Sequence, residues 1–84
     1  MINKIDNYVE LALLSNELSD AKEHLDNLIN KMFNDDMSEV EFRINLAHIY
    51  SHLNRAWNSR NHVGEMDTEL WEEFSKFPKE IEPL

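Results

Sequence analysis

The sequence predicts an all-α protein, built as an antiparallel helical hairpin (about 4–33 and 39–62) plus a short third helix (about 68–77). The chain has one glycine and two prolines in 84 residues, most of which are good helix formers. Seven apolar residues between positions 11 and 32 recur at alternating steps of three and four, as in a helix that packs lengthwise against another. They are Leu11, Leu14, Leu18, Ala21, Leu25, Leu28 and Met32.

The first helix is expected to begin near residue 4, because Asn3 and Asp6 are both good N-cap residues. Its two halves differ. From Leu18 onward only one stripe is apolar, whereas Ile5–Leu14 is apolar on nearly every side. A helix that is apolar on nearly every side needs neighbours on more than one side. We therefore expect at least two elements to cover this N-terminal half.

The second helix is predicted to start at Glu39. Ser38 and Glu41 have the spacing of a capping box, in which the serine hydroxyl and the glutamate carboxylate each accept a backbone N–H. The same alternating steps then run from Phe42 to Ala56, and Gly64 is the expected left-handed stop. Because the turn before Ser38 is short, the two helices should form an antiparallel hairpin.

The third helix is bounded by Asp67, a suitable N-cap, and by Pro78, which cannot continue a helix. In an antiparallel hairpin the end of the second helix lies beside the start of the first. The third helix therefore emerges next to Ile5–Leu14, and we expect it to cover that segment.

A chain of this length forms one domain, predicted over 1–78 with a C-terminal tail at 79–84. Its core is small, and small domains usually gain stability from a disulfide, a metal or a partner chain. The absence of cysteine leaves helix packing, oligomerisation or a histidine and carboxylate metal site. No leader peptide and no membrane-spanning apolar run is visible, so a cytoplasmic location is expected.

A homodimer is the predicted assembly, in the form of a helical bundle. Val40, Ile44 and Ala47 project from the side of the second helix that faces away from the hairpin, and a second copy would cover them. Aromatic residues of the third helix are expected in the core, but they would anchor a partner if that helix docks incompletely. The candidate interface residues are Val40, Ile44, Ala47, Trp71, Phe74 and Phe77.

The net charge of −9 disfavours direct binding to nucleic acid, since an acidic surface repels phosphate. The predicted function is non-enzymatic, an adaptor or regulatory protein that acts through contacts with other proteins, basic ones among them. The alternative is an acidic inhibitor or immunity-type protein that mimics nucleic acid against a basic enzyme. No cofactor and no catalytic residue is predicted, because no nucleophile motif or glycine-rich phosphate loop is present.

His48 and His52 are the weak metal candidates, because a separation of four places both rings on one helical face. The Glu-x-x-His pair of carboxylate metal sites in four-helix bundles does not occur here. Neighbouring arginine positions would also repel a cation. The sequence therefore predicts surface or interface histidines and no bound metal.

Arg55 and His62, with six residues between them on one helix, resemble the Arg/His pair of the HEPN ribonucleases at these two positions only. That family usually has a polar residue after the arginine, where this chain has Ala56. The resemblance implies that both side chains reach a scissile phosphate. The second alternative is thus a metal-binding or ribonuclease-like protein that uses His48, His52, Arg55 and His62.

Overall fold

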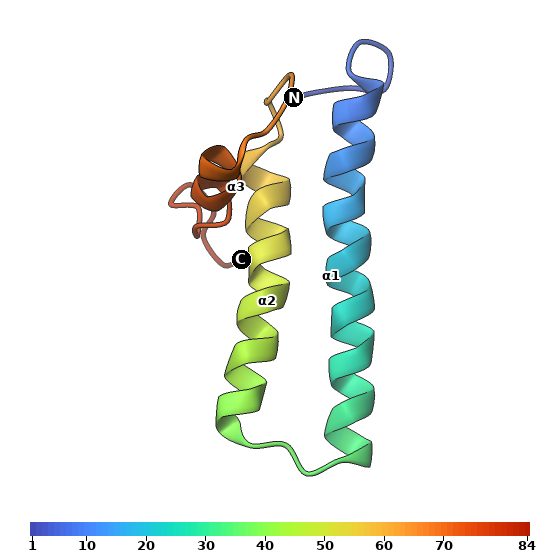
Figure 1. Ribbon diagram of the computed structural model, residues 1–84, viewed down its shortest axis with the longest axis vertical. Coiled ribbons are helices and arrows are strands. Elements are labelled where there is room, and N and C mark those ends of the chain that lie inside the picture. Colours follow the sequence, from blue (N-terminus) through green and yellow to red (C-terminus); the bar gives the residue numbers. More distant parts are fainter.

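The computed structural model describes residues 1–84 and contains three helices, α1 (Tyr8–Asn34), α2 (Glu39–Asn58) and α3 (Thr68–Phe74). α1 and α2 lie side by side and run antiparallel, and α2 lies between α1 and α3 (Figure 1). The all-α class and the helical hairpin are therefore confirmed. None of the three helices combines the length and the apolar character that a membrane span requires.

The core of the hairpin is one narrow row of residues on each helix. Leu14, Ala21 and Leu28 follow one another at steps of seven along α1 and are buried. Ile49 and Ala56 are their buried counterparts on α2, also seven apart. A single neighbouring helix covers only this central row. The other members of the predicted α1 pattern are consequently less covered, and Leu18, Leu25 and Met32 remain 47%, 44% and 49% exposed.

The start of α2 at Glu39 is confirmed, together with half of the predicted capping box. The Ser38 hydroxyl accepts a hydrogen bond from the Glu41 amide at 3.1 Å. The Glu41 carboxylate does not return to Ser38, because it lies 3.5 Å from the Lys31 ammonium across the hairpin. The serine therefore supplies the cap alone.

Replacing Ser38 with alanine is expected to lower the free energy of unfolding by about 1 kcal/mol, since an amide of the first turn loses its acceptor. Urea denaturation followed by circular dichroism measures this change. Ser19→Ala, in the exposed middle of α1, is the control and should change stability by no more than a few tenths of a kcal/mol. Equal effects of the two substitutions would contradict a capping role for Ser38.

α1 begins four residues later than predicted, because the side chain of Asn3 shapes a separate turn before it. Its Oδ1 accepts from the amides of Ile5 and Asp6, at 3.0 and 2.9 Å. The turn places Ile2 in the core, and the Ile2 amide donates to the carbonyl of Arg60 at 2.8 Å. The N-terminal segment thus contributes packing where a continued helix was expected.

α2 also ends earlier than predicted, at Asn58 rather than near residue 62. The Asn58 side-chain amide donates to the carbonyls of Phe74 and Lys76, at 2.8 and 3.0 Å. Gly64 does adopt a left-handed conformation, with φ at 96°, but within the following loop. α3 is likewise shorter than predicted and stops at Phe74 instead of residue 77.

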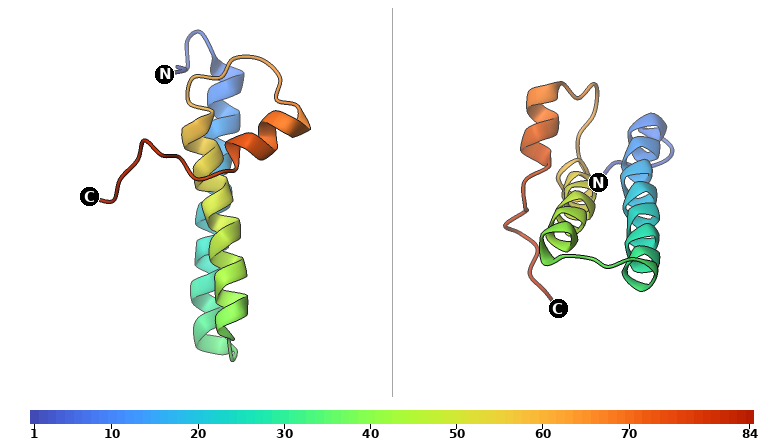
Figure 2. Two further views of the ribbon diagram at one scale, coloured as in Figure 1. Left: turned by 90° about the vertical axis from the view of Figure 1, so that its left-hand side faces the viewer. Right: turned by 60° about the horizontal axis from the view of Figure 1, so that its bottom comes forward.

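The predicted position of the third helix is wrong. α3 packs on α2, on the side away from α1 (Figure 2), and Ile5 stays 85% exposed. The cause is polar. Carbonyls at the end of α3 need donors, and the amides of Asn54 and Asn58 on α2 supply them, Asn54 to Ser75 at 2.9 Å. The segment Ile5–Leu13 therefore keeps large apolar side chains in solvent.

Candidate functional site

Cross-helix polar pairs line one side of the core row, and we call this side the polar edge. On α1 it is formed by residues at steps of seven, and on α2 their partners recur at the same step in the opposite direction. Lys31 pairs with Glu41, His24 packs on His48, and Glu17 pairs with Arg55. The antiparallel register of the hairpin thus aligns these residues in facing pairs.

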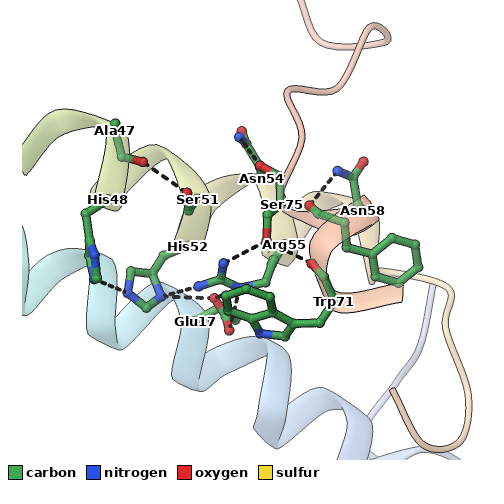
Figure 3. Close-up of polar contacts among 11 residues, drawn as sticks. Glu17, Ala47, His48, Ser51, His52, Asn54, Arg55, Asn58, Trp71 and Ser75 are labelled. Carbon is green, nitrogen blue, oxygen red and sulfur yellow. Dashed lines mark hydrogen bonds and ion pairs between the residues drawn. The ribbon is translucent and has the colours of Figure 1, made fainter. Parts of the chain in front are cut away.

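Arg55 is the structural centre of the polar edge, with only 5% of the residue exposed. Its Nε donates to both carboxylate oxygens of Glu17, at 2.9 and 3.1 Å, and its Nη1 donates to the Ser75 hydroxyl at 2.9 Å. The guanidinium also lies 4.2 Å from the centre of the Trp71 ring (Figure 3). One side chain therefore connects α1, α2 and the end of α3.

His52 is buried next to this ion pair, and its surroundings select a tautomer. Its Nδ1 lies 3.0 Å from a Glu17 oxygen and 3.1 Å from Nη2 of Arg55. A carboxylate only accepts and a guanidinium only donates, so Nδ1 can bond to just one of them. We assign Nδ1–H as the donor to Glu17, because the carboxylate oxygen is the closer partner and its charge is less delocalised than that of the guanidinium. Nε2 of His52 is then unprotonated, and its lone pair faces Nε2 of His48 at 3.1 Å.

Three imidazole rings come together where this lone pair points, and we call them the histidine cluster: His24, His48 and His52. Nε2 of His52 lies 3.1 Å from Nε2 of His48. The His24 ring stacks on His52 with centroids 5.3 Å apart and meets His48 edge-on at 4.3 Å. One nitrogen from each ring lies within 4.8 Å of the other two.

Partial burial lowers the pKa of His48 below its ordinary value of 6.5, and the proximity of His24, His52 and Arg55 lowers it further, because a positive charge beside another is unfavourable. The lowered pKa favours the neutral His48 ring, which has one unprotonated nitrogen.

The structure brings His48 and His52 together as their spacing predicted, and it adds two residues that the sequence reasoning missed, His24 and Glu17. Both belong to the row of α1 that steps by seven beside the core row. Combining that step with the antiparallel register would have placed them opposite His48 and Arg55. His62 lies apart from the cluster, with Nε2 at 3.0 Å from the Glu65 carbonyl oxygen.

Arg55 and His62 both line a cleft of about 510 Å³ between α1, the end of α2, the following loop and α3. Three carboxylates line the same cleft, those of Glu10, Glu17 and Glu65. Arg55 already pairs with Glu17, so the cleft has an excess of negative charge, which is unfavourable for a phosphate backbone. The two residues of the HEPN resemblance thus share a surface whose electrostatics do not suit RNA.

The predicted interface residues divide into two groups. Val40, Ala47 and Phe77 line a shallow groove on the outer face of α2, and Ile44 is exposed nearby. Trp71 and Phe74 contact residues of the same chain, Trp71 over Arg55 and Phe74 against the His62 ring, with centroids 5.7 Å apart. The expectation that the aromatic residues of the third helix lie in the core is nevertheless wrong, because α3 packs outside the hairpin and has no buried residue.

Comparisons with known protein families, with curated proteins and with solved structures find no match for this chain. Its function is therefore inferred from its own residues, namely the polar edge, the cleft and the apolar surfaces that α3 leaves uncovered.

Proposed function

We propose that this protein is a non-enzymatic helical protein that acts through protein–protein contacts, of which the first is with a second copy of itself. The total accessible surface supports this. The chain exposes 6757 Å², whereas a folded monomer of its mass, 10.0 kDa, exposes about 5,200 Å². The excess of about 1,500 Å² falls within the range that each protomer of an obligate homodimer buries.

An apolar edge on the side of the core row opposite the polar edge supplies the contact surface. Leu18, Leu25 and Met32 follow one another at steps of seven along α1, and Leu53 of α2 is 41% exposed. Leu11 lies seven residues before Leu18, and Leu46 lies seven residues before Leu53. Both are already partly buried in the hairpin. Two hairpins that pack through these edges form a four-helix bundle with knobs-into-holes packing.

Such a dimer keeps its acidic outer surfaces in solvent, and the charge of −9 per chain then favours a basic third partner. This is the adaptor or regulatory role that the composition predicts. The groove at Val40 and Ala47 is a second, shorter apolar surface on the outer face of α2. Because it lies on another side of the hairpin, mutations can separate the two surfaces.

Sedimentation equilibrium at several concentrations tests the dimer. The wild type is expected to be dimeric at tens of micromolar. Leu25→Glu should weaken the dimer by about 30-fold or more, because a buried leucine contributes about 2 kcal/mol and a carboxylate resists burial. Ile44→Glu is the matched control on the outer face of α2 and should leave the dimer intact.

A wild-type monomer at these concentrations would overturn the proposal. If Ile44→Glu dissociates the dimer and Leu25→Glu does not, the interface is the outer face of α2 and not the apolar edge.

A further inference from the structure

We propose that the histidine cluster binds a divalent first-row transition-metal ion, Zn²⁺ in the first place, which clamps α1 to α2. His24 comes from α1, and His48 and His52 come from α2. The inference rests on the polar edge alone, so it is independent of the proposed dimer, which uses the opposite edge.

The separation of the ring nitrogens supports a shared ion. Zn–N bonds of 2.0–2.1 Å in tetrahedral geometry place two ligand nitrogens about 3.3 Å apart. The Nε2 atoms of His48 and His52 already lie 3.1 Å apart. The nitrogen of His24 lies within 4.8 Å of both, and its side chain is exposed. Closing the site therefore requires the His24 nitrogen to approach the other two by at most about 1.5 Å.

Glu17 orients the buried ligand. A metal-binding histidine usually donates its second N–H to a carboxylate or a carbonyl, which fixes the tautomer and makes the coordinating nitrogen more basic. Nδ1 of His52 lies 3.0 Å from the Glu17 carboxylate, so its Nε2 is the coordinating atom (Figure 3). The same carboxylate pairs with Arg55, so the repulsion by arginine that the sequence suggested is offset locally.

The donor set selects the kind of metal. Three imidazoles suit Zn²⁺, Ni²⁺ or Cu²⁺, whereas Mg²⁺ and Ca²⁺ prefer oxygen ligands. The ion would connect residues more than twenty positions apart in sequence, in a small domain that has no cysteine. A metal cross-link is one of the means by which such small domains gain stability.

Calorimetric titration of the tag-free protein with ZnCl₂ tests the site. We expect one Zn²⁺ per chain and an affinity that falls at least tenfold in His24→Gln. His24 is exposed, so this variant should fold and melt like the wild type without metal. His62→Gln is the matched control, because it removes the one histidine outside the cluster, and it should bind as the wild type does. Zinc should also raise the melting temperature of the wild type and of His62→Gln, but not of His24→Gln.

The assignment is overturned if the wild type gives neither binding heat nor a shift in melting temperature. It is equally overturned if His24→Gln binds as tightly as the wild type, or if His62→Gln loses as much affinity. A stoichiometry of one Zn²⁺ per two chains would indicate a site between chains. That result would also contradict the assignment of the site to a single hairpin.

Discussion

Replacing Arg55 with methionine is expected to lower the free energy of unfolding by about 3–5 kcal/mol, the usual cost of removing one member of a buried ion pair. The Glu17 carboxylate, three-quarters buried, then loses its cation, and the Ser75 hydroxyl loses its donor. A domain of 84 residues has a total stability of only about 4–13 kcal/mol, so this loss is a large fraction of the stability. Urea denaturation followed by circular dichroism measures the loss.

Two controls test whether the loss of stability comes from the unpaired, buried Glu17 carboxylate or simply from the removal of a positive charge. Lys31→Met removes the cation of a pair whose side chains are about half exposed, and it should cost less than about 1 kcal/mol. Adding Glu17→Met to Arg55→Met removes the stranded carboxylate and should recover part of the stability. A double variant less stable than Arg55→Met would contradict this explanation.

The hairpin was predictable because periodicity reports directly on the face that a helix buries. Leu14, Ala21 and Leu28 stand at the centre of the predicted row and are buried. The start of α2 was predictable for another reason, since Ser38 makes a local contact with Glu41 that depends on three residues only. Local and periodic signals thus predicted the pairing of α1 with α2 and the start of α2.

The position of α3 depends on contacts that hydrophobic patterning does not weigh. The topology of the antiparallel hairpin predicted a third helix that covers Ile5–Leu14. The side-chain amides of Asn54 and Asn58 instead bind the last carbonyls of α3 and hold it on the outer face of α2. A buried asparagine needs partners, and its preference overrides the apolar complementarity that the sequence suggested.

The histidine cluster was half predictable. His48 and His52 are four apart on one helix, a spacing that is visible in the sequence. His24 and Glu17 come from the other helix, and only the register of the hairpin reveals that they face His48 and Arg55. The polar and apolar edges lie on opposite sides of one core row, so a metal at the first leaves the second free for a partner chain.

The narrow core makes each of its members important, and Leu28→Ala is expected to lower the free energy of unfolding by about 2–5 kcal/mol. Leu28 is 4% exposed and belongs to the cluster around Ala21 and Ile49, between α1 and α2, and α3 does not contact α1 and so does not fill a cavity there. Urea denaturation measures the change, with Leu13→Ala, at an exposed position of the same helix, as the control. Because Leu13 already faces solvent, its truncation should cost less than about 1 kcal/mol. Equal losses at the two positions would mean that α1 packs through a different row, and the buried contact between α1 and α2 would then have to be placed elsewhere.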